Sequence, residues 1–189
     1  MKDLGRIYLL IAALMLPVGG AFADSYSDTT ALFEHSGASR EFFHSSYAYA
    51  VFPTIGKGGF VVGAAHGDGR VYEHGRHVGD TSMTQLSIGF QFGGQAYSEI
   101  LFFENAEALA RFERGDFALS ADASAVAITA SASASAGTTG ASAGASGTKE
   151  HATTTGRYVN GVAVFTIGKG GLMYQAAVAG QKFTYKAVR

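Results

Sequence analysis

The chain contains no cysteine and only two prolines among its 189 residues. The lack of cysteine excludes disulfides, thiolate zinc sites, a cysteine nucleophile and a lipidated N-terminal cysteine. Without disulfides, the fold must be held together by its hydrophobic core. The net charge is only −1, so the chain also lacks the overall basic field that captures nucleic acid.

The N-terminus has the layout of a secretory signal peptide. Two basic residues lie among the first six, an apolar run covers residues 7–18, and Ala21 and Ala23 form an A-x-A-like cleavage site. The apolar run is shorter than the roughly 20 residues that span a bilayer. We predict cleavage after Ala23, which removes residues 1–23 and exports residues 24–189 to the periplasm or cell envelope. An uncleaved anchor is the alternative.

The remainder of the chain predicts a β-rich domain with few helices. Glycine is abundant, at 26 residues, and short apolar runs separated by glycine are typical of strands and tight turns. Asp68-Gly69 predicts a hairpin turn. The alternation of apolar and polar residues from Leu86 to Phe92 predicts a strand with one apolar face.

Two parts of the chain predict helix. Residues 24–50 have helical spacing, with a break near Gly37 and an end at or before Pro53. A short helix is expected at 105–114, with Asn105 as its N-cap and Gly115 as its stop. We therefore predict an α+β fold: a mainly antiparallel β-sandwich or barrel-like core, an N-terminal helical segment, and one short helix near 105–114.

Residues 130–148 are almost pure alanine, serine, glycine and threonine. Such a tract buries little surface and costs much conformational entropy to order. We predict a loop there that joins two strands of small residues. The length left after cleavage suits one domain that covers residues 24–189.

The hexapeptide TIGKGG occurs twice, at Thr54–Gly59 and at Thr166–Gly171. A nucleotide-binding P-loop requires serine or threonine after the lysine and a helix behind it, and both copies lack these. One interpretation is a glycine turn at a strand junction with an exposed lysine. The other is that Lys57 and Lys169 contact an anionic head group. The similar surroundings of the two copies suggest two related hairpins.

No other pattern amounts to an active site. Ser142 lies in a chance G-x-S-x-G match within the low-complexity tract. His74 and His77 have only an H-x-x-H spacing, which we interpret as surface histidines rather than a metal site. Glu99 and Glu104 could form an acid pair, but we expect Glu99 on a solvent-facing strand edge. We therefore expect no enzyme activity, no metal and no cofactor.

The order of three segments resembles the SYLF family: YAVFPTIGKGGFVVGAAHGDGRVY, then LSIGFQFGGQAYSEILFFENAEALARFERGDFALSADASAVA, then VFTIGKGGLMYQAAVAG. The resemblance covers about residues 29–189, and the middle segment with its F-x-N-x-x-A-L-x-x-F helix is the most specific. It implies a phospholipid-binding module. Eukaryotic relatives bind phosphoinositides, and some bind actin, which we do not expect of an exported bacterial chain.

The chain departs from the family pattern in two loops. An Ala/Ser/Gly tract replaces a glycine-proline-glycine type turn, and the final repeat copies the first one. We predict a non-enzymatic exported domain that binds anionic phospholipid at an envelope membrane. The candidate lipid contacts are Lys57, Lys169, Lys182, Lys186 and Arg189. The alternative is a structural envelope protein that self-associates or docks to a protein partner, through the tract and exposed strand edges.

Overall fold

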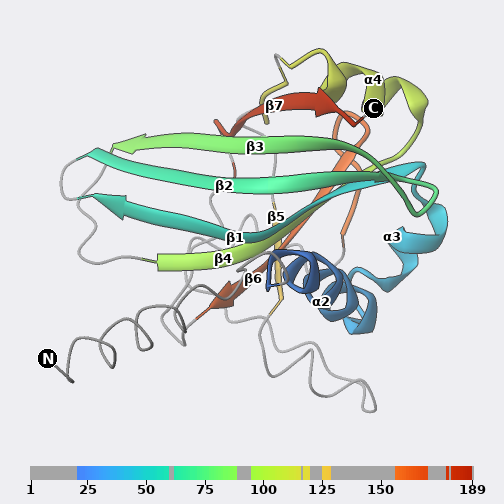
Figure 1. Cartoon of the computed structure of the whole chain (residues 1–189), viewed down its shortest axis with the longest axis horizontal. Coiled ribbons are helices and arrows are strands. Elements are labelled where there is room, and N and C mark those ends of the chain that lie inside the picture. Colours follow the sequence, from blue (N-terminus) through green and yellow to red (C-terminus); the bar gives the residue numbers. More distant parts are fainter. Residues whose placement is uncertain are drawn as a thin grey trace, which may run out of the picture.

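The computed structural model describes residues 21–59, 62–88, 95–115, 117–119, 125–128, 156–169, 178 and 180–188. Its elements are α2 (Ala21–His35), α3 (Arg40–Ser45), β1 (Ala48–Gly59), β2 (Val62–Glu73), β3 (Arg76–Ile88), β4 (Gln95–Phe103), α4 (Ala106–Glu113), β5 (Ala125–Ile128), β6 (Val162–Lys169) and β7 (Lys182–Ala187) (Figure 1). Most of the predicted signal peptide, the predicted loop at 130–148 and Arg189 lie outside the described residues.

All seven strands belong to one sheet with the order β5-β6-β4-β1-β2-β3-β7. Every neighbouring pair is antiparallel except β5 and β6. Figure 1 shows β1 to β4 side by side, with β7 and α4 beyond β3 and with β6 on the opposite side, beyond β4. The predicted α+β fold with a mainly antiparallel sheet is confirmed.

The sheet is curled rather than flat. The rings of Phe52 in β1 and Phe183 in β7 lie 5.7 Å apart, although three strand spacings separate them, about 14 Å along a flat sheet. One stretch of chain also meets both edges: Ala118 bridges to Lys182 in β7, and β5 pairs with β6. The sheet therefore approaches a closed barrel, as the predicted barrel-like core requires.

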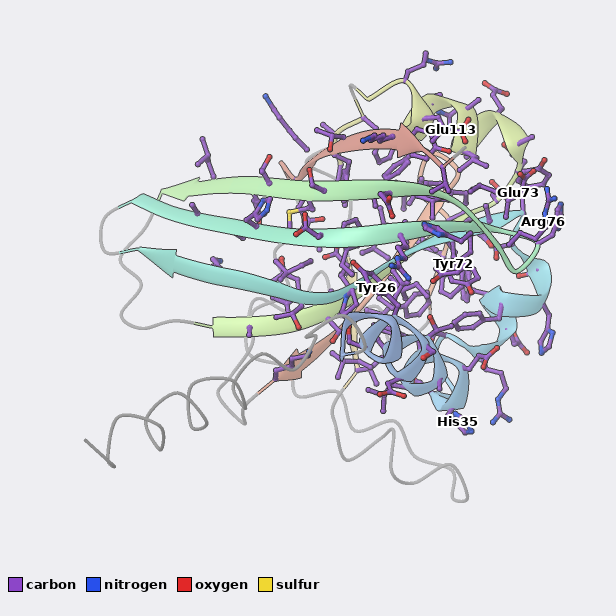
Figure 2. The ribbon with its side chains drawn as sticks, in the orientation of Figure 1. Tyr26, His35, Tyr72, Glu73, Arg76 and Glu113 are labelled. Atoms are coloured by element: carbon purple, nitrogen blue, oxygen red, sulfur yellow. The ribbon has the colours of Figure 1, made fainter. Side chains whose placement is uncertain are left out.

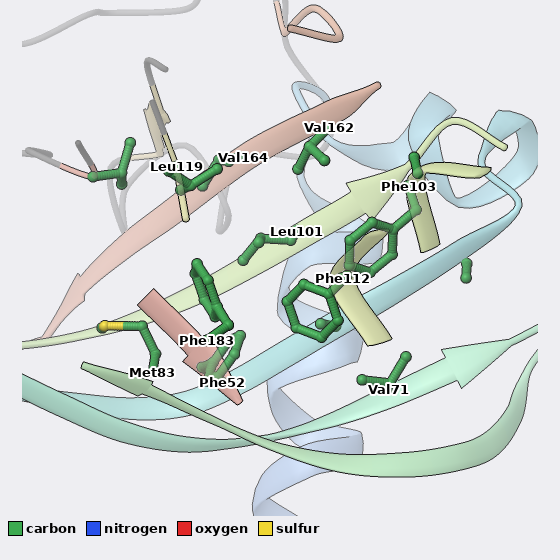
Figure 3. Close-up of a cluster of buried hydrophobic side chains, with 14 of the residues drawn as sticks. Phe52, Val71, Met83, Leu101, Phe103, Phe112, Leu119, Val162, Val164 and Phe183 are labelled. Atoms are coloured by element: carbon green, nitrogen blue, oxygen red, sulfur yellow. The ribbon is translucent and has the colours of Figure 1, made fainter. Parts of the chain in front are cut away.

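Each face of the sheet has its own hydrophobic cluster. The cluster on the concave face, here called the inner face, includes Phe52, Leu101, Phe112 and Phe183 (Figure 3). The cluster on the opposite, outer face lies beneath α2 and α3 and includes Phe102 and other residues. Alternation along each strand supplies both clusters, because successive side chains point to opposite faces.

Helix α4 follows the sequence prediction closely. Asn105 has extended backbone and accepts a hydrogen bond from the Ala108 amide through its side chain, and Leu109 and Phe112 are buried. Gly115 follows the helix with a φ of 79°, a conformation that favours glycine. The predicted N-cap and the predicted stop are both confirmed.

Replacing Asn105 by alanine should lower the free energy of unfolding by about 1 kcal/mol, because the α4 N-terminus loses its cap. Urea unfolding followed by circular dichroism would measure this. The exposed Glu104, one residue earlier, gives a matched control, since Glu104→Ala removes no cap. Equal effects of the two changes would show that the cap contributes nothing.

The N-terminal helical segment is confirmed, but its end was predicted wrongly. Residues 36–39 separate α2 from α3, close to the expected break at Gly37. However, β1 already begins at Ala48 and continues through Pro53. Pro53 lies where the pairing of β1 shifts register with both neighbours. Proline is tolerated in a strand at such a bulge, because no ladder hydrogen bond needs its missing N–H there.

The predicted hairpin turn at Asp68-Gly69 is wrong, because both residues lie inside β2. The turn that joins β2 to β3 is His74-Gly75, with φ values of 48° and 78°. Positive φ at both central residues matches a type I′ hairpin turn. Gly69 instead provides space, since a Cβ there would lie 2.5 Å from the Phe52 ring.

The expectation of two related hairpins is also wrong. β1 and β2 form a hairpin, but β6 pairs with β4 and β5, and β7 pairs with β3. Because β4 and β5 pair with the two edges of β6, neither edge is left for β7. β7 instead pairs with β3, at the end of the sheet opposite to β5 and β6.

Candidate functional site

The two copies of TIGKGG lie on either side of β4. Ala96 of β4 is opposite Gly56 of β1 and opposite Lys169 of β6. The first copy is part of β1 and pairs with β2 as far as Gly59. The prediction of a glycine turn at this copy is therefore wrong, because its backbone is taken up by the sheet ladder. Gly170 and Gly171 of the second copy lie outside the described residues.

Identical residues of the two copies point to opposite faces of the sheet. Ile55 belongs to the inner cluster, whereas the equivalent Ile167 belongs to the outer cluster. The cause is the register shift between Phe52 and Ile55, which β1 has and the pairing of β6 with β4 lacks. A single extra residue in a strand reverses the direction of every side chain after it.

Lys57 consequently points to the inner face, two residues beyond Ile55. It is only 9% exposed, and its neighbours on the adjoining strand β2 and the next strand β3 are Ala65 and Gln85. Burial lowers the pKa of its ammonium group. Among the described residues, no carboxylate forms an ion pair with Lys57.

Lys169, in contrast, is exposed on the outer face. Its Nζ donates a hydrogen bond to Thr54 Oγ1 at 2.8 Å. Thr54 is the first residue of the other copy, so this bond joins the two copies directly across β4. The partial desolvation that accompanies this contact lowers the pKa of Lys169.

Lys182 lies at the same level of the barrel as Lys169. A single row of paired residues crosses the outer face from one lysine to the other: Lys169, Ala96, Gly56, His66, Thr84 and Lys182. Lys169 is the last residue of β6 and Lys182 is the first residue of β7. This level marks the end of the barrel at which β1, β3 and β6 finish, here called the rim.

Leu86 lies at the rim two residues beyond this row, about 7 Å further along β3, and it is 79% exposed. The sequence predicted an apolar strand face that includes Leu86, but the residue points outward, on the same side as the exposed Thr84. In the strand pairing, Leu86 of β3 lies opposite Ala64 of β2, and Ala64 lies opposite Gly58 of β1. The rim thus combines exposed lysines with an exposed apolar side chain.

Lys186 lies outside the rim. It is four residues beyond Lys182, about 13 Å along an extended strand, and it is opposite Asp80. The Asp80 carboxylate is also 3.1 Å from His77 Nε2 and 3.9 Å from Arg70 Nε. Of the predicted C-terminal cluster, Lys182 and Lys186 are therefore spread along β7, with Lys186 on a surface of mixed charge, and Arg189 lies outside the described residues.

The inner face holds a buried polar cluster that the sequence did not predict. Glu99 is completely buried, opposite Phe52 in β1 and Thr166 in β6. Gln181 Nε2 donates to Glu99 Oε2 at 2.9 Å and approaches Tyr97 Oη at 3.3 Å. Within the described residues, Glu99 Oε1, Gln181 Oε1 and Thr166 Oγ1 have no hydrogen-bond partner.

The expectation of Glu99 on a solvent-facing edge is wrong, because β6 covers that side of β4 and the sheet curls around its side chain. Burial raises the pKa of Glu99 to about 8, and the hydrogen bond from Gln181 opposes this rise only in part. Glu104, which was paired with it as a possible acid pair, is exposed. The two carboxyl groups therefore lie in different environments.

The histidines have ordinary contacts. His74 is exposed in the β2–β3 turn, and its ring packs against Tyr47 at 4.9 Å. In the part of the chain that the structure describes, no group of three or more histidine or acidic side chains could hold a metal ion.

Near His77, the guanidinium group of Arg70 lies 4.3 Å from the centre of the Tyr26 ring. Helix α2 brings Tyr26 onto the outer face near Tyr72 (Figure 2).

None of the helices in the described ranges is long and apolar enough to cross a membrane.

Comparison with known proteins identifies the family. Residues 84–186 match the family Ysc84, described as Las17-binding protein actin regulator. No curated protein matches the chain. The match extends from β3 through β7 and includes α4, so it covers more than half of the chain. The chain is a member of the Ysc84 family, whose domain is the SYLF domain that the sequence resembles.

Proposed function

We propose that the protein is a non-enzymatic, exported module that binds anionic phospholipid at an envelope membrane. The observation that carries the proposal is the rim, where Lys169 and Lys182 lie in one row of paired residues and the exposed Leu86 lies two residues beyond that row in β3. Membership of the family and the signal-peptide pattern support it.

The arrangement has the chemistry of a surface that meets a bilayer. Cationic side chains at an anionic membrane contribute about 1 kcal/mol each, and an exposed leucine adds apolar contact at the head-group boundary. The outer-face position of Gly56 has no atom within 4 Å of where a Cβ would lie. The row is therefore open at Gly56, whereas His66 and Thr84 in the same row have exposed side chains.

Neutralising both rim lysines in the double variant Lys169→Gln, Lys182→Gln should weaken binding to anionic vesicles about 30-fold, because two contributions of about 1 kcal/mol are lost. Cosedimentation of residues 24–189 with phosphatidylglycerol/phosphatidylcholine vesicles would measure this. Added salt should weaken wild-type binding, because the attraction is screened.

The matched control is Lys186→Gln, which removes an exposed charge from the same strand away from the rim. Its effect should be at most a few-fold. A double variant that binds as tightly as the wild type, or a wild type that does not distinguish anionic from pure phosphatidylcholine vesicles, would refute the proposal.

The alternative, a structural protein that self-associates through its strand edges, has less support. The edge of β7 is bridged by Ala118, with hydrogen bonds from the Leu119 amide to the Gln181 carbonyl and from the Phe183 amide to the Phe117 carbonyl. β5 covers β6. Deleting residues 130–148 and measuring oligomeric state and lipid binding would separate the two functions. The actin regulation in the family description is not proposed for an exported chain.

A further inference from the structure

Lys57 and Lys169 occupy the same position of the same hexapeptide, yet their surroundings differ. Lys169 is exposed and hydrogen-bonded to Thr54. Lys57 is on the inner face and 9% exposed, two residues from the end of β1 at the rim. The same hexapeptide therefore places its lysine in two different environments.

Most of the Lys57 side chain is covered by the barrel, and a charge in such a place is normally compensated by a partner. Burying a charge without a counter-charge is costly, and proteins normally pair it or neutralise it. In the strand pairing, Lys57 lies between Ala65 of β2 and Gln95 of β4, with Gln85 of β3 beyond Ala65. None of these residues carries a negative charge. No described carboxylate opposes the lowering of its pKa by burial.

We propose that Lys57 is a recessed phosphate-binding group inside the rim, and that Lys169 is not. The proposal rests on the proposed function for the source of its ligand, a lipid phosphate that projects into the barrel end. A free phosphate ion has the same chemistry. The dianionic form supplies the counter-charge that none of the described residues provides there, and its oxygens accept from an ammonium donor.

The recessed position also implies selectivity. A phosphate that ends a head group, as in phosphatidic acid, can enter a recess, whereas the phosphodiester of phosphatidylglycerol is flanked by substituents on both sides. The exposed lysines of the rim impose no such restriction. Lys57 should therefore discriminate between phosphate types, and the rim lysines should respond to net charge alone.

The first test uses inorganic phosphate and no membrane. Lysine side-chain resonances of residues 24–189 would be titrated with pH by NMR, with and without phosphate and at constant ionic strength. Phosphate should raise the pKa of Lys57 by about one unit, which corresponds to tenfold tighter binding to the charged form, and should leave the pKa of Lys169 unchanged. Equal shifts of the two lysines, or none, would overturn the inference.

The second test uses vesicles of phosphatidylcholine with either phosphatidic acid or phosphatidylglycerol at equal surface charge. Lys57→Gln should weaken binding to phosphatidic acid vesicles at least fivefold more than binding to phosphatidylglycerol vesicles. The matched variant Lys169→Gln should weaken both equally. Thermal unfolding of each variant checks that the fold is retained, and the NMR test on the wild type decides the inference if Lys57→Gln does not fold.

The outcomes separate this inference from the proposed function. If anionic vesicles bind but the two lysine variants behave alike and phosphate leaves the pKa of Lys57 unchanged, the recessed site is refuted and the rim function remains. If no vesicle binds but phosphate raises the pKa of Lys57 selectively, the phosphate site holds with a free-phosphate ligand and the membrane function is refuted.

Discussion

Replacing Glu99 by glutamine should stabilise the protein strongly at pH 8.5 and scarcely at all below pH 4.5. The pKa of Glu99 rises from 4.5 to about 8 on folding, because its carboxyl group is completely buried. Between these values the folded state keeps a proton that the unfolded state releases. The stability that the neutral acid contributes is therefore fully present below pH 4.5 and is lost as the pH rises through 8.

The size of this effect follows from the shift. A shift of about 3.5 pKa units, at about 1.4 kcal/mol each, corresponds to roughly 5 kcal/mol between the two ends of the pH range. Glutamine has nearly the shape of glutamic acid and carries no charge at any of these pH values. The free energy of unfolding of Glu99→Gln should therefore not fall in this way as the pH rises.

Urea unfolding of the wild type and Glu99→Gln at several pH values from 4 to 9 would measure the difference between them. The matched control is Glu104→Gln, which neutralises an exposed carboxyl group five residues away and should change stability little at every pH. Parallel curves for the wild type and Glu99→Gln would show that Glu99 is ionised or solvated in the folded protein.

Replacing Phe183 by alanine should lower the free energy of unfolding by about 3–5 kcal/mol, the usual cost of removing a buried phenylalanine. Its ring contacts Phe52, Phe112 and Phe117, and it is 2% exposed. Since β7 extends one end of the curled sheet, this side chain joins that end to the middle of the barrel and to α4 (Figure 3).

A loss of that size is a large part of the 5–15 kcal/mol that stabilises a typical domain. Thermal and urea unfolding would measure it. The exposed Lys186 on the same strand gives the control, because Lys186→Ala should change stability by no more than about 0.5 kcal/mol. If Phe183→Ala costs no more than the control, β7 does not close the barrel in solution.

The consequences for the rim follow from the same geometry. Lys169, Lys182 and Leu86 come from β6, β7 and β3. The strand pairing places the two lysines in one row and Leu86 two residues beyond it. A search for a basic run would favour the C-terminal segment with Lys182 and Lys186. In the structure, these two lysines share a face but not a level, and only Lys182 belongs to the rim.

Local sequence patterns determined much of the fold. The glycine-rich apolar runs predicted a β-rich protein, and the short helix α4 formed where Asn105 and Gly115 placed its ends. Both predictions depend on interactions within a few residues, which a sequence shows directly. The order of the segments was also sufficient to identify the family.

Only the tertiary structure decided where the candidate functional side chains point. Lys57 and Lys169 have the same local sequence, but the register shift around Pro53 turns one inward and leaves the other outside. Glu99 looked like an exposed strand residue and became a buried acid because β6 pairs beside it and the sheet curls over it. Strand register and curvature depend on partners distant in the chain, so the sequence alone identified these residues without determining their environments.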